Sequence, residues 1–485
     1  MTRLIVGPFN RVEGDLEVEL TLGEGQVVSA RVTAPMYRGF EQILRGKHPL
    51  DALVYVPRIC GICSVSQSVA AARALSQLAG VAPARNGVLA SNLILAVENL
   101  ADHLSHFYLF FMPDFCRDVY REQDWYARAR ERFMPETGES VRLALQARQR
   151  WMTMLGTLAG KWPHTQSIDP GGSSRALDAS ERMKLQLRVR EFRRFLETRL
   201  FAAPLEEVSA QTTQSALWSR WCRPDDAGDF GLFLHMAQDL GLQQLGRGPG
   251  RYLSYGAYPQ PDGGFLVPAG LWREEGHRLD ALDLNAITED ATHAWLHQLG
   301  AALHPYDGVT LPDPDKLNAY TWNKAPRLAD EVVETGALAR QLVAGQPLVR
   351  EAVAATGGTV YTRVLARLIE LATVVQSMEF WLTELEPEAP YCQPFTLPAN
   401  GQAVGLNEAA RGSLGHWLRI EDGRIANYQI VAPTSWNFSP RDARGQPGAL
   451  EQALAGAPVR PGETTPVSVQ HIVRSFDPCM VCTVH

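Results

Sequence analysis

Apolar and polar residues alternate near the start of the chain. Between residues 16 and 22 every second residue is apolar: Leu16, Val18, Leu20 and Leu22. This period of two predicts a half-buried β-strand. The turn residues Gly23-Glu24-Gly25 predict a reversal into a second strand through Val28 and Val32. We therefore expect a small β-hairpin layer at the N-terminal end.

A helical period dominates the rest of the chain. The stretch from Leu89 to Met112 is apolar with few breaks and ends at Pro113, which predicts a central helix buried on most sides. Residues 181–201 and 360–382 place apolar side chains along one face, with Arg and Glu opposite. Both segments are therefore expected to form amphipathic helices.

The pattern as a whole favours one mainly helical body. Stretches rich in Pro and Gly near 247–270 and 440–465 predict long surface loops. No repeat, low-complexity tract or linker divides the sequence. The expected fold is mainly α with small β elements (α+β), a central helix bundle with an N-terminal β-hairpin layer, as a single body over residues 1–485.

Charge and hydropathy narrow the classes of partner. A net charge of −7 over 485 residues gives no basic surface for nucleic acid. No apolar run approaches the roughly 20 residues that span a bilayer. The start, Met1-Thr2-Arg3-Leu4, lacks the pattern of a secretory signal. We expect a soluble, cytoplasmic protein with no transmembrane segment.

The cysteines are too few and too unevenly spaced for a disulfide scaffold. Three stand alone, and each is predicted to be a small buried hydrophobe: Cys116, Cys222 and Cys392. The other four form two Cys-x-x-Cys pairs: Cys60 with Cys63, and Cys479 with Cys482.

Two residues between cysteines allow both sulfurs to reach one ion, and two such pairs complete a four-sulfur set. Structural zinc sites commonly use spacers of about 15–20 residues between pairs. Here residues 64–478 separate them, so a large fold must bring them together. A redox dithiol would need a βαβ context that neither pair has. Soft thiolates suit zinc, nickel and iron alike, so the chemistry leaves the metal open.

The surrounding residues carry a resemblance. The segments Arg58-Ile59-Cys60-Gly61-Ile62-Cys63 and Asp477-Pro478-Cys479-x-x-Cys482-x-x-His485 resemble the two hallmark motifs of nickel–iron (NiFe) hydrogenase large subunits. Further matching segments extend the likeness over essentially the whole chain: Arg11-Val12-Glu13-Gly14, Arg38-Gly39-Phe40-Glu41, Asp102-His103, Lys324-Ala325-Pro326-Arg327, Glu408-Ala409 and Pro433-Thr434-Ser435-Trp436-Asn437.

The resemblance implies a specific metal centre. Cys60 and Cys479 would bind nickel terminally, and Cys63 and Cys482 would bridge nickel to an iron that carries CO and two cyanides. Three further residues match family positions around those diatomic ligands: Arg411, Thr434 and Pro433. A separate Mg²⁺ would be held by Glu41, His485 and the Ile430 carbonyl, with Lys324 close by.

The resemblance also implies the reaction, heterolytic cleavage of H₂. Cleavage needs a metal to take the electron pair and a base to take the proton. Cys479 would accept the proton and Glu13 would relay it, with Arg411 and Asp102 as charged neighbours. The three lone cysteines cannot hold a Cys₄ cluster for the electrons. A small subunit with iron–sulfur clusters is therefore expected, as a heterodimer or a dimer of heterodimers.

Departures from the family pattern suggest a subtype. Ile62, Phe110 and Gln67 replace the usual Val, Leu and His, and resemble the regulatory hydrogenases that signal H₂ to a histidine kinase. The regulatory members lack a C-terminal extension that many relatives carry, and this sequence ends at His485.

The larger side chains of Ile62 and Phe110 would hinder the approach of O₂ to the metals more than that of the smaller H₂. Gln67 can donate to a bridging sulfur but cannot titrate near neutral pH. Asp15, Ala410 and Arg474 also depart from the pattern, the last two without explanation.

Two alternatives stay open. A respiratory uptake hydrogenase would share every metal ligand but turn over faster. A scaffold relative of the quinone-site subunit of respiratory complex I would share the fold, although such relatives typically lack the four cysteines.

Overall fold

A computed structural model describes residues 2–222 and 228–485. The N-terminal layer is a three-stranded antiparallel sheet of order β1-β2-β3, formed by β1 (Thr2–Val6), β2 (Glu17–Gly23) and β3 (Gln26–Thr33). The predicted hairpin is confirmed, and β1 adds a strand. The register shifts between Thr21 and Leu22. Val27 and Val32 consequently face the core, whereas Val28 is 46% exposed.

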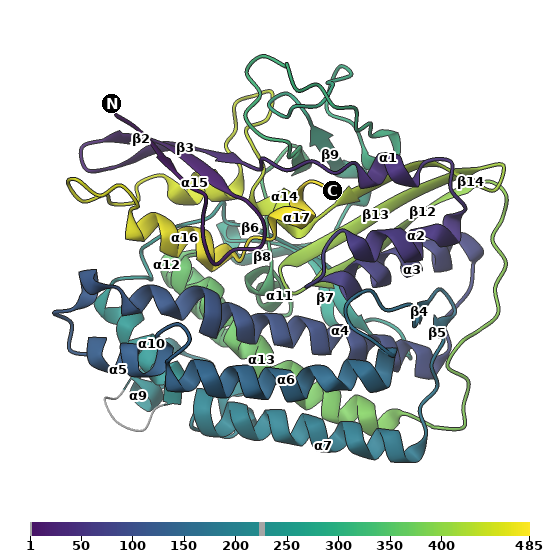
Figure 1. Ribbon diagram of the computed structural model, residues 1–485, viewed down its shortest axis with the longest axis horizontal. Helices are drawn as coiled ribbons and strands as arrows, with labels where there is room; N and C mark the ends of the chain where they lie inside the picture. The colour runs from purple at the N-terminus through teal and green to yellow at the C-terminus, as the bar shows by residue number, and fades with distance from the viewer. Residues whose placement is uncertain (1, 223–227) are drawn as a thin grey trace.

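Four long helices lie side by side below this sheet (Figure 1). They are α4 (Arg85–Ser105), α6 (Glu139–Ala159), α7 (Ala179–Phe195) and α13 (Val360–Glu384). The predicted central helix is confirmed as α4, which continues through a π-helical turn over His106–Phe111 before Pro113. The face predicted for 181–201 is buried at Leu185, Val189 and Phe192.

The amphipathic prediction for 360–382 holds for the C-terminal half of α13 but is wrong for the N-terminal half, where residues 360–372 are all buried. Arg363, Arg367 and Glu370 are as buried on α13 as its apolar residues. Two of them form ion pairs with residues outside α13: Arg363 pairs with Glu334 at 2.7 Å, and Glu370 pairs with Arg340 at 2.8 Å. Buried ion pairs of this kind make an enclosed stretch of helix look amphipathic in sequence.

The loop prediction for 247–270 is also wrong. The segment forms β6 (Arg251–Pro259) and the start of β7 (Phe265–Arg273), in a sheet of order β11-β6-β7-β8. Strand β6 is buried on both faces, so its residues show no alternation. The other two strands are β8 (Arg278–Asp280) and β11 (Glu334–Thr335). The 440–465 stretch is irregular except for α15 (Ala449–Leu454).

A third sheet packs against helix α3 (Ser64–Ala79), which begins after the first cysteine motif. It is antiparallel, with order β12-β13-β14, and consists of β12 (Gly401–Ala409), β13 (Gly412–Glu421) and β14 (Arg424–Val431). Helix α3 packs against β12 and β13. Two further pairs of short strands are β4 (Ile168–Asp169) with β5 (Gly172–Ser173), and β9 (Ile287–Asp290) with β10 (Ala325–Leu328).

Shorter helices fill the spaces between these layers. They are α1 (Phe40–Leu44), α2 (Ala52–Tyr55), α5 (Tyr126–Phe133), α8 (Leu205–Ser209), α9 (Gln214–Trp221), α10 (Gly228–Asp239), α11 (Ala337–Val343), α12 (Pro347–Thr356), α14 (Pro433–Asn437), α16 (Val467–Phe476) and α17 (Met480–Thr483). The C-terminus lies inside the molecule beside α14 and α17 (Figure 1), and His485 is buried. In the described ranges, no helix combines the length and hydropathy of a membrane span.

The three lone cysteines differ in environment. Cys116 is buried as predicted, whereas Cys222 is half-buried and Cys392 is exposed. The prediction is therefore wrong for Cys392. It lies in the irregular segment before β12, where its backbone forms an isolated bridge with Gly172.

Candidate metal centre

The four paired cysteines meet at one buried point. Their sulfur atoms all lie within 4.8 Å of one another. The Sγ–Sγ distance is 3.5 Å between Cys60 and Cys479, and 3.0 Å between Cys63 and Cys482. Across residues 2–222 and 228–485, no other group of three or more His, Cys, Asp or Glu side chains converges in this way.

The Arg38 side chain links the two cysteine motifs. Cys63 is the N-cap of α3, where the helix dipole favours a thiolate. The Arg38 guanidinium donates to the carbonyl of Ile59 at 2.7 Å and also to that of Val481. One side chain therefore connects both motifs.

The Glu13 backbone holds the second motif from the other side. The Met480 N–H donates to the Glu13 carbonyl at 2.7 Å, and the Glu13 N–H donates to the Pro478 carbonyl at 3.4 Å. These bonds fix Glu13 beside Cys479. Burial, and then the neighbouring Cys60 sulfur, raise the pKa of the half-buried Glu13 carboxyl.

Glu98 is a part of the site that sequence reasoning missed. From inside α4 its carboxylate accepts from the backbone N–H groups of Val65 and Ser66, at 2.9 and 3.0 Å, and from the Trp162 indole at 3.0 Å. Glu98 thereby accepts from backbone N–H groups in the first turn of α3, next to Cys63. Burial raises the pKa of Glu98 to about 7. A lone glutamate in the apolar run 89–112 was the available signal.

The crowded sulfurs fit a bound cation. Burial and the neighbouring sulfurs raise the pKa of the Cys479 thiol well above its usual range. Hydrogen bonding to the neighbouring sulfurs also raises the pKa of the Cys63 thiol well above its usual range. Four thiols this close cannot ionise together without a compensating positive charge, and a coordinated metal ion deprotonates such thiols outright.

Arg411 provides a buried cation beside the sulfurs. Its guanidinium pairs with Asp102 at 2.9 Å and with Asp477 at 3.1 Å. Burial raises the pKa of Asp102 to about 8 even though Arg411 opposes the shift. The Arg411 Nε–H has no hydrogen-bond partner in the described part of the chain. It is therefore available as a donor to a bound group.

Thr434 and Pro433 lie in the first turn of α14. The Thr434 hydroxyl oxygen accepts from the Cys479 N–H at 3.1 Å, which leaves the hydroxyl proton free to donate elsewhere. Thr434 therefore contacts the second cysteine motif, and Pro433 precedes Thr434 in the chain.

Gln67 lies one turn into α3 and faces a sulfur. Its amide nitrogen is 3.9 Å from Cys482 Sγ, and its amide oxygen is 2.8 Å from His416 Nε2. Burial lowers the pKa of the His416 imidazole to about 3, so this ring is neutral. Sequence reasoning missed His416, because a lone histidine on β13 carries no motif.

The predicted Mg²⁺ ligands are partly assembled. The Glu41 carboxylate lies 3.2 Å from His485 Nε2 and accepts from the Ile430 N–H at 2.8 Å. The Lys324 ammonium lies 3.7 Å from the Glu41 carboxylate. Burial alone would raise the pKa of Glu41, but Lys324 and His485 lower it to about 2. Since both main-chain groups of a residue in an antiparallel strand face the same edge, the Ile430 carbonyl also points to this side.

The predicted gas-access residues lie in different elements. Ile62 is half-buried and packs in the cluster that contains Cys60 and Cys63. Phe110 is half-buried in the π-helical turn after α4, and its carbonyl accepts from Arg11 at 3.0 Å. Asp15 is exposed, and the Ala410 carbonyl accepts from Arg340 at 3.0 Å.

Arg474 forms buried hydrogen bonds that account for an arginine at this position. Its buried guanidinium donates to Asp114 at 2.6 Å and to the Asn10 side chain at 2.7 Å. Arg11 also pairs with Asp114. Arg474 therefore joins α16 to the loop that precedes Glu13.

Replacing Arg474 with Leu should lower the free energy of unfolding by about 3 kcal/mol, because Asp114 stays buried with fewer partners. The matched control is Arg3→Leu, which removes the exposed pair with Glu19 and should cost less than about 1 kcal/mol. Thermal unfolding of both variants measures the difference. Equal losses in the two variants would refute this role for Arg474.

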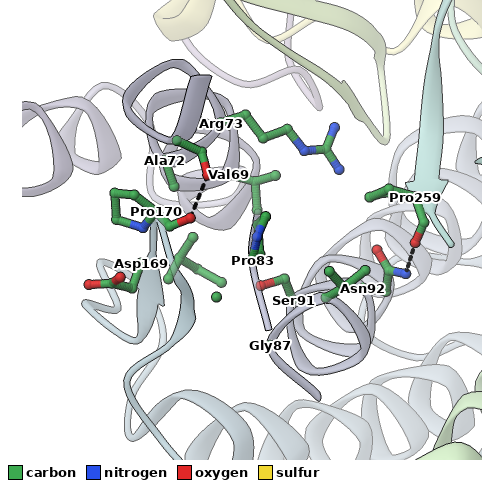
Figure 2. A pocket seen from close by; sticks show the side chains of 14 residues that line it. Val69, Ala72, Arg73, Pro83, Gly87, Ser91, Asn92, Asp169, Pro170 and Pro259 are labelled. Atoms are coloured by element: carbon green, nitrogen blue, oxygen red, sulfur yellow. Dashed lines mark hydrogen bonds between the residues drawn. The ribbon is translucent and has the colours of Figure 1, made fainter. Parts of the chain in front are cut away.

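A cavity of about 60 Å³ lies away from the cysteines, between α3 and α4 (Figure 2). Figure 2 shows Val69, Ala72 and Pro83 around it, with the Arg73 guanidinium at one side. None of the four paired cysteines lines it. The cavity therefore adds nothing to the metal centre.

Comparisons with known proteins agree with this geometry. The nickel-dependent hydrogenase family model matches residues 38–130 and 142–485. The periplasmic NiFeSe hydrogenase large subunit of Desulfomicrobium baculatum is 30% identical, over 100% of this chain and 95% of the relative. The uptake hydrogenase large subunit of Rubrivivax gelatinosus is 25% identical, over 100% of this chain and 95% of the relative.

A solved structure is also similar. The reduced, active Ni-Fe-Se hydrogenase from Desulfomicrobium baculatum superposes with a TM-score of 0.87 at 30% identity, and 100% of each chain is covered. The family match and the four cysteines exclude the non-enzyme scaffold alternative. The chain therefore belongs to the nickel-dependent hydrogenase family, as the large subunit of an oxidoreductase that acts on H₂.

Proposed function

We propose that this chain cleaves H₂ heterolytically at a nickel–iron centre held by its four paired cysteines. The observation that carries the proposal is the convergence of four buried sulfurs within 4.8 Å. Cys60 and Cys479 would be the terminal nickel ligands, and Cys63 and Cys482 the bridging ones. When bound, the centre supplies the electrophile that polarises H₂ and accepts its electrons.

Protons would leave through Cys479 and Glu13. A metal-coordinated thiolate is a usable base, because coordination lowers its pKa toward neutrality. Glu13 is fixed beside Cys479 by main-chain hydrogen bonds, and its raised pKa favours proton uptake. The carboxyl can then pass the proton outward, because it is only half-buried.

Four residues would surround CO and two cyanides on the iron. Arg411 offers its unpartnered Nε–H, and Thr434 offers its hydroxyl proton. Asp102 holds the Arg411 guanidinium in place, and Pro433 supplies an apolar contact beside Thr434. Donors of this kind, outside the direct ligands, tune a metal centre through its ligands.

Glu41, His485 and the Ile430 carbonyl would hold a Mg²⁺ that ties the C-terminus to β14. Hard oxygen ligands suit this ion. The Lys324 ammonium already lies against Glu41, so it would remain as a neighbour of the ion rather than a ligand.

A small subunit with iron–sulfur clusters would accept the electrons, in a heterodimer or a dimer of heterodimers. Within the described residues, Cys116, Cys222 and Cys392 do not converge on one another, so they offer no cluster site. A cytoplasmic location is part of the same proposal.

Within the family, we propose a regulatory, H₂-sensing role with low turnover and a histidine kinase as partner. It is supported by the combination of Ile62, Phe110 and Gln67. The competing role is respiratory uptake, which is favoured by the name of the Rubrivivax gelatinosus relative.

The complex of this chain with its small subunit should form HD and D₂ when H₂ is supplied in D₂O. Reversible heterolytic cleavage exchanges one atom of hydrogen with solvent at each reversal, so isotope exchange requires no external electron acceptor. Mass spectrometry of the gas phase measures it. Complete absence of HD from a nickel-loaded complex would refute the proposed function.

A further inference from the structure

A buried chain of hydrogen bonds runs from β14 to the sulfur of Cys482. The Tyr428 hydroxyl lies 2.8 Å from His416 Nδ1, and His416 Nε2 lies 2.8 Å from the Gln67 amide oxygen. The Gln67 amide nitrogen lies 3.9 Å from Cys482 Sγ, a long contact that sulfur acceptors allow. Tyr428, His416 and Gln67 are each at most 1% exposed.

The direction of these hydrogen bonds follows from their donors and acceptors. A metal-bound thiolate carries no proton, so the Gln67 amide nitrogen must face Cys482 and the amide oxygen must face His416. A carbonyl oxygen only accepts, so His416 Nε2 carries the imidazole proton. The neutral ring then accepts at Nδ1 from the Tyr428 hydroxyl. Every donor in the chain therefore points toward the sulfur.

We propose that His416 and Tyr428 are positioning residues that hold the Gln67 amide as a donor to the Cys482 thiolate and so withdraw electron density from the metal centre. The inference rests on the proposed function, because it requires Cys482 to be a bridging metal ligand. Hydrogen bonds to coordinating sulfurs are a recognised determinant of a centre's potential, and linked hydrogen bonds polarise one another.

Each member of the chain has a separate role. Without His416, the Gln67 amide oxygen would lose its donor, and the amide could rotate away from Cys482. Without Tyr428, His416 would keep its contact to Gln67 but lose the hydroxyl group that donates to its Nδ1. The effect on the sulfur should therefore fall in the order Gln67, His416, Tyr428.

The experiment is the infrared C–O stretching frequency of the nickel-loaded complex, compared among wild type, Gln67→Leu, His416→Phe and Tyr428→Phe. Each substitution should shift the band to lower frequency, because a stronger thiolate donor increases back-donation from iron to CO. The double variant Gln67→Leu with His416→Phe should show no shift beyond Gln67→Leu alone. His416→Gln, which can still donate to the Gln67 oxygen, should restore the wild-type frequency.

Several outcomes would overturn the inference. An unchanged band in folded, nickel-loaded His416→Phe would overturn it while leaving the proposed function intact. An additional shift in the double variant would also overturn it, because His416 would then act by a route other than Gln67. If His416→Phe fails to fold, Tyr428→Phe removes a single oxygen and decides the same question. Absence of any C–O band in the nickel-loaded wild type would overturn the inference and the proposed function together.

Discussion

Replacing Glu13 with Gln should lower H/D exchange by roughly 10²–10⁴-fold, the usual contribution of a positioned proton-transfer group. The amide keeps the shape of the side chain and some of its hydrogen bonds, but it cannot carry a proton. The Glu13 backbone contacts to Pro478 and Met480 remain, so nickel content should not change. The measurement is isotope exchange, normalised to nickel.

The matched control is Glu17→Gln, four residues away on β2, where the side chain is exposed. This variant should keep wild-type exchange. Normal exchange by a fully metallated Glu13→Gln complex would remove Glu13 from the proton path.

The size filter that the sequence predicts at Ile62 and Phe110 implies that Ile62→Val with Phe110→Leu should make hydrogen oxidation more sensitive to O₂. The two changes delete a methylene and an aromatic ring, so they should admit O₂ more readily while changing the access of the smaller H₂ little. They should cost about 1–4 kcal/mol of stability. Hydrogen oxidation recorded before, during and after an oxygen pulse measures the response.

Ile5→Val with Phe380→Leu is the matched control, because it makes the same chemical changes at side chains that are 55% and 59% exposed. Its oxygen response should equal that of the wild type. An unchanged oxygen response in the folded, metallated Ile62/Phe110 variant would refute the size filter. The sensing role would then lose two of the three residues that support it.

The features that could be predicted from sequence have short-range or highly specific signals. Strict alternation at 16–22 predicted β2, because one face of that strand is buried and the other is not. The largely apolar run from Leu89 predicted α4, because that helix is enclosed. The paired cysteines predicted the metal centre, since a four-sulfur set has few other uses.

The features that could not be predicted depend on long-range partners. Strand β6 is buried on both faces, so it lacks the alternation that marks a half-buried strand. Arg363 and Glu370 look like solvent-exposed charges until Glu334 and Arg340 are placed beside them. His416 contacts Gln67 only after β13 packs on α3, and nothing in the local sequence indicates that contact.

Metal analysis combined with an infrared spectrum of the purified complex distinguishes a nickel–iron centre from a zinc site, because CO and cyanide on iron absorb where proteins do not. We expect nickel in an amount equimolar to this chain, one C–O band and two cyanide bands. Equimolar zinc with no such bands would contradict this expectation, and would make the four cysteines a structural zinc site.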